Sequence, residues 1–271
     1  MKSYAIYDEQ LERVEPIGYL FYYEKAQSFI IELSSDLDEW QAPLLFQGLV
    51  RRGIYTIPKD IVLMWVRERI IPSGRQNIGE ILRTHKLKEY SEIAMLTLSK
   101  GRSSQDACYV KEVREDDIPA SIKDRWLGNV IECFPTQRGD IVCMFRDNTT
   151  RYIHLENLIN KYPRIAHVMK HRELLESVQV GVGGYSISFN ESIEIAASDL
   201  IEKGELLPLQ ANDFYGFVQK NVLDTTNACL LIECSRQNLA YLVKEKRVTP
   251  IIQGTKENLY TKGEISRLKN E

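Results

Sequence analysis

Three consecutive polar residues, Arg236, Gln237 and Asn238, carry side chains that match the edges of DNA bases. An arginine guanidinium pairs in two places with guanine O6 and N7, and a glutamine or asparagine amide pairs likewise with adenine N6 and N7. Cationic side chains follow closely and suit phosphate oxygens, which position a protein on DNA without reading its sequence. They are Lys244, Lys246, Arg247 and Lys256. Together the two groups predict a surface that binds double-stranded DNA.

Two short helices are expected to present these side chains. Asp224 and Ser235 each precede a run with helical apolar spacing, and their side-chain oxygens can accept the unpaired first-turn N–H groups of a helix. The predicted buried stripes are Ala228, Leu231 and Ile232 in the first helix, and Leu239, Leu242 and Val243 in the second. The second helix, over residues 236–245, then turns its polar residues outward, Tyr241 among them, as a helix that enters a major groove requires.

A short hairpin over residues 246–260 and a last helix over residues 262–268 are predicted to complete this part of the chain. Residues 235–269 carry eight basic and three acidic side chains, a net of +5, whereas residues 1–40 carry nine acidic and three basic ones. An anionic polymer would therefore be attracted to the end of the chain.

The run from Leu223 to Leu268 resembles the compact winged helix-turn-helix of excisionases and mercury-resistance regulators. The matching positions are Thr225, Ala228, Ile232, Ser235, Arg236, Gln237, Leu239, Leu242, Val243, Arg247 and Val248. Cys229 replaces an alanine, and Glu233 and Lys246 stand where these modules often have glycine. The DNA-binding residues expected here are Thr225, Ser235, Arg236, Gln237, Asn238, Tyr241, Lys244, Lys246, Arg247 and Lys256.

These features favour a bacterial sequence-specific DNA-binding protein, a transcriptional regulator in a toxin–antitoxin-like or mobile-element setting. A module with so small a footprint is expected to act as a homodimer on a two-fold site. In the alternative interpretation, the two helices only pack against the rest of the chain. The protein is then an antitoxin-like interaction scaffold that binds a protein partner without needing DNA.

The middle of the chain shows the period-two patterning of strands. Alternation predicts strands over residues 130–134, 140–145, 149–154, 178–180, 185–189 and 193–195. A helical stretch is expected over residues 155–175, and a glycine-rich turn over residues 181–184. The pattern resembles a family of small uncharacterised bacterial domains found alone or beside toxin–antitoxin-like genes. The likeness is carried by residues 145–148, 155–158, 178–180, 183–187, 193–195 and 198–200. It implies a small antiparallel α+β fold and no catalytic residue.

The first part of the chain is predicted to mix strands and helices. Aromatic and β-branched residues predict strands over 17–23 and 28–33, and Leu37, Trp40, Leu44 and Leu45 form a weak helical stripe. Pro58 is expected in the first turn of a helix, where its missing N–H costs nothing. Further helices are predicted over residues 75–84 and 90–98.

The triplet Arg75-Gln76-Asn77 repeats the Arg-Gln-Asn of residues 236–238 at another predicted helix start. One interpretation is a second DNA-contacting surface over residues 58–88. A solvated basic face is the interpretation that we favour, because three-residue coincidences are common.

With 271 residues, 44% of them hydrophobic, and a net charge of -3, the chain suits a globular protein of two or three domains. The expected class is multidomain α+β. Its domains are a mixed N-terminal α+β domain (1–120), a small antiparallel-sheet α+β domain (121–210) and a winged helix-turn-helix DNA-binding domain (211–271). No segment suits a membrane span or a signal peptide. The five scattered cysteines form no C-x-x-C pair, which favours reduced thiols in a cytoplasm.

No set of residues predicts catalysis. His167 and His171 share a helix face, but no H-E-x-x-H pattern surrounds them, so we expect no metal site. Cys108 has no local activating group. The glycines of residues 181–184 precede a strand instead of a helix, unlike a phosphate loop. We therefore expect no enzyme, no catalytic residue, no metal and no cofactor.

Overall fold

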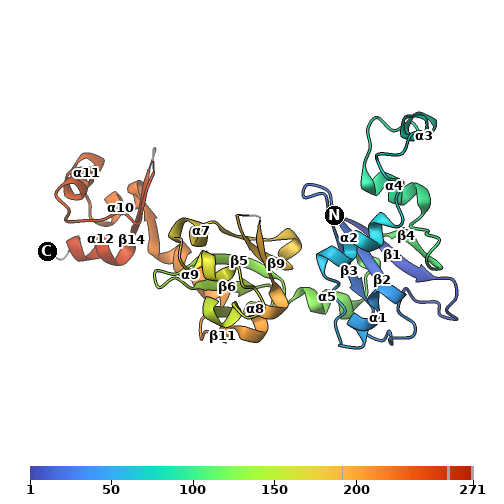
Figure 1. The fold of residues 1–271 in the computed structure, drawn as a ribbon. Coiled ribbons are helices and arrows are strands. Elements are labelled where there is room, and N and C mark those ends of the chain that lie inside the picture. Colours follow the sequence, from blue (N-terminus) through green and yellow to red (C-terminus); the bar gives the residue numbers. More distant parts are fainter. Residues whose placement is uncertain (191, 255–256, 270–271) are drawn as a thin grey trace. The chain divides into compact units, whose positions relative to one another are not determined.

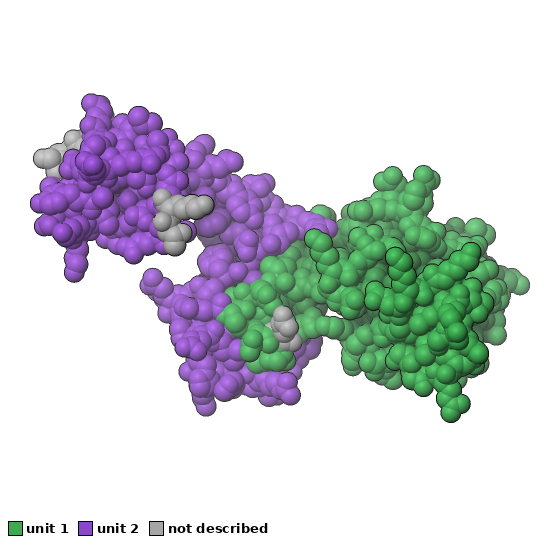
Figure 2. Space-filling view, turned by 90° about the horizontal axis from the view of Figure 1, so that it is seen from above, with its two compact units in different colours: residues 1–130, 177–198 green, residues 131–176, 199–271 purple. Residues whose placement is uncertain are grey.

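The computed structural model describes residues 1–190, 192–254 and 257–269. This described chain is mixed α+β, as the sequence predicts, with short helices and four small antiparallel sheets (Figure 1). Two compact units are distinguished, coloured green and purple in Figure 2. Unit 1 consists of residues 1–130 and 177–198, and unit 2 of residues 131–176 and 199–271. The division into three domains stays a prediction.

A four-stranded antiparallel sheet with the order β3-β2-β1-β4 forms the centre of unit 1. Its strands are β1 (Lys2–Asp8), β2 (Gly18–Tyr23), β3 (Ser28–Leu33) and β4 (Cys108–Val113). The predictions of β2 and β3 are confirmed, whereas β1 and β4 were not predicted. Along β1, Tyr4 and Ile6 alternate with Ala5 between the two faces of the sheet, which is the period expected of a strand buried on both sides.

Helices cover both faces of this sheet (Figure 1). One face packs against apolar side chains of α1 (Leu44–Val50), α2 (Lys59–Arg67) and α4 (Glu92–Ser99). Phe46, Trp65 and Leu96 are fully buried there. The other face is covered by α5 (Ala120–Trp126), whose Ile122 and Trp126 pack against Tyr19, Phe21 and Ile30.

The predicted apolar stripe from Leu37 to Leu45 is not a helix. Only α1 is helical in this region, and it begins at Leu44, directly after Pro43. Trp40 is 81% exposed and Leu44 is 84% exposed, so neither belongs to a buried stripe. Proline disfavours helical backbone at the residue before it but is tolerated at the start of a helix.

The other predicted helices of unit 1 are present with shifted ends. Pro58 stands immediately before α2, and the helix predicted over residues 75–84 is α3 (Ile78–Thr84). Arg75, Gln76 and Asn77 are all exposed, and α3 has no fully buried residue. This fits a solvated helical face better than a packed recognition element.

A buried carboxylate, Glu32, lies between the sheet of unit 1 and α5. Its Oε2 accepts hydrogen bonds from Nε of Arg125 at 2.7 Å and from the hydroxyl of Thr56 at 3.0 Å. Arg125 also donates to the hydroxyl of Ser35 and the carbonyl oxygen of Leu33, both at 2.6 Å. Burial raises the pKa of Glu32, and the attraction of Arg125 opposes that rise. The ion pair therefore compensates a charge that the apolar surroundings disfavour.

A second antiparallel sheet of unit 1 has the order β10-β9-β8. Its strands, β8 (Val178–Val180), β9 (Ser186–Phe189) and β10 (Ile193–Ala196), confirm the prediction. The predicted glycine turn joins β8 to β9 as a 3₁₀ turn, in which Gly184 has a φ of 78°. A Cβ atom there would lie 2.3 Å from the carbonyl oxygen of Val130, so the close backbone approach requires glycine.

Unit 2 contains a four-stranded sheet with the order β11-β7-β6-β5. Its strands are β5 (Val130–Pro135), β6 (Ile141–Phe145), β7 (Thr150–Ile153) and β11 (Glu205–Leu206), and α8 (Ala197–Lys203) precedes β11. The predictions of β5, β6 and β7 are confirmed. β6 is an inner strand of this sheet, and its side chains from Ile141 to Phe145 are all buried.

The prediction of one helical stretch over residues 155–175 is wrong. The chain instead forms a 3₁₀ turn (Leu155–Leu158), α6 (Ile165–Val168) and α7 (Arg172–Glu176). Pro163 interrupts the stretch because it lacks an N–H donor and disfavours helical backbone at the preceding residue. The apolar residues of this stretch are nevertheless buried, as Leu158, Ile165, Val168 and Leu175 show.

Candidate nucleic-acid interface

The last part of unit 2 combines a helix pair, a hairpin and a last helix, as the sequence predicts. Its elements are α9 (Ala211–Asn221), β12 (Val222–Asp224), α10 (Thr225–Leu231), α11 (Arg236–Lys244), β13 (Ile252–Gln253), β14 (Asn258–Thr261) and α12 (Lys262–Lys269). The three strands form an antiparallel sheet in the order β12-β14-β13. The sequence interpretation did not include α9 or β12.

Both predicted helix caps are confirmed. The Oδ1 of Asp224 accepts the backbone N–H of Asn227 at 2.7 Å, and the Oγ of Ser235 accepts that of Asn238 at 3.1 Å. The two helices, β14 and α12 then share one small core. Its fully buried members are Ala228, Cys229, Leu239, Val248, Tyr260 and Ile265. Leu239 and the partly buried Val243 are residues through which α11 joins this core.

The end of α10 turns sharply through a left-handed residue. Glu233 has a φ of 54°. The N–H of Cys234 donates to the carbonyl oxygen of Cys229 at 3.0 Å, and the N–H of Glu233 donates to that of Leu230 at 3.4 Å. This pair of bonds is a Schellman motif, in which a left-handed residue reverses the chain and satisfies the last carbonyl groups of a helix.

The end of α11 repeats this arrangement. Lys246 has a φ of 56°. The N–H of Arg247 donates to the carbonyl oxygen of Leu242 at 2.9 Å, and that of Lys246 donates to Val243 at 3.0 Å. Lys246 and Glu233 occupy the two positions at which the modules that this region resembles often have glycine. At both positions the backbone therefore adopts the positive φ that glycine favours, although the residue is not glycine, and this costs conformational energy.

Replacing Lys246 with glycine is expected to raise the stability of this region by about 0.5–1 kcal/mol, because glycine adopts a positive φ without strain. The matched control is Lys244→Gly, two residues earlier and also exposed, which should lower stability by up to about 1 kcal/mol because Lys244 is the last helical residue of α11. Thermal unfolding followed by far-UV circular dichroism compares the two variants. Equal changes in both would contradict the assigned backbone conformation.

The outward side of α11 is exposed over its length. Arg236, Gln237, Asn238 and Lys244 are exposed, and Tyr241 is 58% exposed. These are the residues that the sequence assigns to base and phosphate contacts. At 3.6 residues per turn, Gln237, Asn238, Tyr241 and Lys244 fall on one side of α11, while Arg236 lies nearer to α10 and donates to Thr226. Their accessible donors and acceptors could meet the edges of bases in a major groove.

Two hydroxyl residues of the predicted site have structural roles. The Oγ1 of Thr225 accepts the N–H of Asn258 at 3.3 Å and lies 3.4 Å from the carbonyl oxygen of Asn258, which ties α10 to β14. The Oγ of Ser235 caps α11, as described above. We therefore leave Thr225 and Ser235 out of the candidate contact set.

The predicted phosphate-binding residues follow the end of α11. Lys246 and Arg247 are exposed there. Lys256 lies outside the described residues. The cationic side chains at the end of α11 thus follow the polar residues of its first turns. This placement suits contacts with the phosphate groups of the DNA strands that flank a groove.

Thr226 belongs to this surface although sequence reasoning did not single it out. Its Oγ1 accepts a hydrogen bond from Nη2 of Arg236 at 2.6 Å, so the first residue of α11 is held by the first turn of α10. A shallow depression beside this contact is lined by Thr226, Cys229, Leu230, Glu233, Cys234 and Arg236. No local sequence signal could find Thr226, because the contact joins two helices across a turn.

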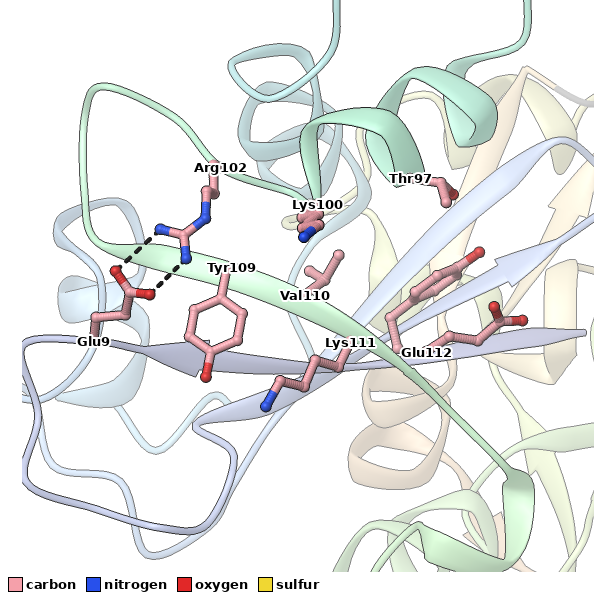
Figure 3. A pocket seen from close by; sticks show the side chains of 9 residues that line it. Glu9, Thr97, Lys100, Arg102, Tyr109, Val110, Lys111 and Glu112 are labelled. Carbon is pink, nitrogen blue, oxygen red and sulfur yellow. Dashed lines mark hydrogen bonds and ion pairs between the residues drawn. The ribbon is translucent and has the colours of Figure 1, made fainter. Parts of the chain in front are cut away.

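A second hollow lies in unit 1 (Figure 3). Its lining residues are Tyr4, Glu9, Thr97, Lys100, Arg102, Tyr109, Val110, Lys111 and Glu112. Arg102 donates to both oxygens of Glu9, at 3.0 and 2.5 Å, and Lys111 lies over the ring of Tyr109. The lining offers mixed charges but no histidine or cysteine, so we assign no reaction to it.

The residues that the sequence considers for catalysis or metal binding are Cys108, His167 and His171. Cys108 is buried, and burial, followed by Asp106 and Asp8, raises its pKa, which disfavours a thiolate. The rings of His167 and His171 lie 4.3 Å apart. Within the described ranges, no three histidine, cysteine or acidic side chains are placed to share a metal ion, and no described helix has the length and apolar character to cross a bilayer.

Comparison with protein families, with curated proteins and with solved structures finds no match to this chain.

Proposed function

We propose that the protein is a sequence-specific double-stranded DNA-binding protein that regulates transcription, and that residues 222–269 act as a winged helix-turn-helix. The observation that carries this proposal is the division of α11 into two sides. Leu239 is fully buried, while Arg236, Gln237 and Asn238 are exposed at the start of the helix. A recognition helix needs this division, since its back must pack while its first turns reach base edges.

The surrounding elements support the same function. Ser235 and Asp224 fix the starts of both helices, and the β12-β14-β13 sheet would serve as the wing. Cationic residues at the end of α11 would contact phosphate groups. A single copy offers only a few base contacts, so we propose that two copies bind a two-fold site.

The test is equilibrium binding by fluorescence anisotropy. Duplexes selected by the full chain from a random library, and duplexes from the region upstream of its own gene, are titrated at several salt concentrations. Specific sites should bind at least about a thousandfold more tightly than scrambled duplexes, with log affinity falling by about 0.9 per phosphate contact against log salt. The Lys244→Ala variant should reduce that slope by about 1 per copy. Equal affinity for selected and scrambled duplexes would reject sequence-specific binding.

A protein-interaction scaffold is the second candidate, and α9 favours it. Its side chains Tyr215, Phe217 and Val218 are 42%, 54% and 38% exposed, which is a large apolar content for a free helix surface. Such a helix could bind a protein partner or a second copy. Loss of partner binding with unchanged DNA affinity in a Phe217→Ser variant would separate this candidate from the first.

A further inference from the structure

Two cysteine side chains, those of Cys229 and Cys234, meet at the turn between α10 and α11. Both side chains line the depression that Arg236 and Thr226 share. They are also the two ends of the Schellman motif, whose first and last residues commonly touch through their side chains. The backbone of the turn therefore brings these two residues close together.

The backbone at this turn suits a covalent link. The N–H of Cys234 donates to the carbonyl oxygen of Cys229 at 3.0 Å, and standard bond lengths then leave at most roughly 6.8 Å between their Cα atoms. Disulfides in proteins span Cα separations of roughly 4.4–6.8 Å. The two residues can therefore be bridged with little movement of the main chain.

We propose that Cys229 and Cys234 are an oxidation site, whose intramolecular disulfide lowers the affinity of α11 for DNA. The effect on DNA affinity rests on the proposed function, whereas the formation of the disulfide does not. The oxidant is a peroxide. The thiol of Cys234, which is the more exposed of the two, is oxidised to a sulfenic acid, and the peroxide is reduced to water. The thiol of Cys229 then attacks that sulfur, so that the S–S bond forms, the S–O bond breaks and a second water leaves.

The other three cysteines are expected to stay reduced. Cys108, Cys133 and Cys143 are buried, and burial raises the pKa of all three, that of Cys133 to about 12. The thiolate is the reactive form, so such groups react slowly with peroxides. Burial also raises the pKa of Cys229, so the more exposed Cys234 is expected to meet the oxidant first.

The bridge would disturb the start of α11. In the reduced chain the Sγ of Cys234 lies 3.4 Å from the carbonyl oxygen of Ser235, the cap of that helix. An S–S bond of roughly 2.05 Å pulls this sulfur toward Cys229. The next residue after the cap is Arg236, which lines the same depression. A shift of the cap therefore moves the first side chain that would read a base.

The first readout does not involve DNA. The reduced full chain is treated with hydrogen peroxide, its free thiols are alkylated after denaturation, and its peptides are identified by mass spectrometry. We expect a peptide pair linked through Cys229 and Cys234 that dithiothreitol separates, with the other three cysteines alkylated. Alkylation of both Cys229 and Cys234, or linkage mainly between two chains, would overturn the proposal.

The second readout is DNA affinity by anisotropy before and after oxidation. Loss of one bidentate base contact corresponds to an affinity at least about fivefold lower, and dithiothreitol should restore it. The Cys229→Ala variant, which carries the alanine found in the modules that this region resembles, should bind equally well with or without peroxide, and Cys234→Ser provides a second such control. A linked protein with unchanged affinity would overturn the switch. Failure of the reduced protein to bind any DNA would reject the proposed function and leave the thiol result standing.

Discussion

Replacing both Arg236 and Gln237 with alanine is expected to lower the affinity for the selected DNA site at least about thirtyfold, because each bidentate base contact contributes about 1–3 kcal/mol of discrimination. Both side chains are exposed, and the hydrogen bond from Arg236 to Thr226 that is lost lies at the surface, so the thermal unfolding midpoint should fall only slightly. Anisotropy titrations with selected and scrambled duplexes measure the change. Affinity for scrambled DNA should fall far less, since it depends mainly on phosphate contacts.

The chain offers a matched control for this variant. Gln137 and Arg138 are also adjacent and exposed, but they lie between β5 and β6, away from α11. Replacing both with alanine removes the same side chains and the same charge. If this control binds DNA as tightly as the unmodified protein and the α11 variant does not, the base contacts belong to α11. Equal binding by both variants would remove the recognition-helix assignment.

The Arg125→Met variant is expected to lower the free energy of unfolding of unit 1 by about 3 kcal/mol at neutral pH, since it leaves a buried carboxylate without its partner. Glu32 has no exposed side-chain surface, whereas Arg125 is 23% exposed, so the loss falls mainly on Glu32. All three tryptophans of the chain, Trp40, Trp65 and Trp126, belong to unit 1. Denaturant unfolding followed by tryptophan fluorescence therefore reports this unit.

The loss in the Arg125→Met variant should depend on pH. Burial already raises the pKa of Glu32, and removal of Arg125 raises it further. A carboxyl group with a raised folded-state pKa contributes its stability below the ordinary glutamate value and loses it as pH rises through the folded value. The variant should therefore approach the parent near pH 4.5 and fall behind as pH increases. Combining Arg125→Met with Glu32→Gln should recover most of the loss at pH 7. A deficit that is independent of pH and unaffected by Glu32→Gln would contradict the role of the ion pair.

The helices of the candidate site could be predicted because their signals are local. Asp224 and Ser235 cap their own helices within three residues, and Leu239 lies on a stripe that one helix turn defines. Strands β2 and β3 were predictable for a similar reason, since aromatic and β-branched residues run through each. Where an element is determined by residues close together in the sequence, the residue pattern was therefore sufficient to predict it.

The remaining features depend on partners far away in the chain. Strand β4 pairs with β1 across about a hundred residues, as the pair Cys108 and Asp8 shows. No sequence pattern near Cys108 predicts that pairing. The contact between Thr226 and Arg236, and the role of Thr225 in holding β14, likewise arise only when separate elements meet. The helical stretch over residues 155–175 failed for the opposite reason. Its apolar spacing was correct, but the local effect of Pro163 outweighed it.

Unit 1 is assembled from two stretches of chain, 1–130 and 177–198, with residues 131–176 intervening. Within it, the side chain of Asn129 donates to the carbonyl oxygen of Gly183 at 3.0 Å, across 54 positions of sequence. A gene truncated after residue 130 would encode this unit without its closing hairpin, and we expect such a product to be retained in inclusion bodies. An expression boundary placed after residue 198 keeps both stretches of unit 1, together with the intervening residues 131–176.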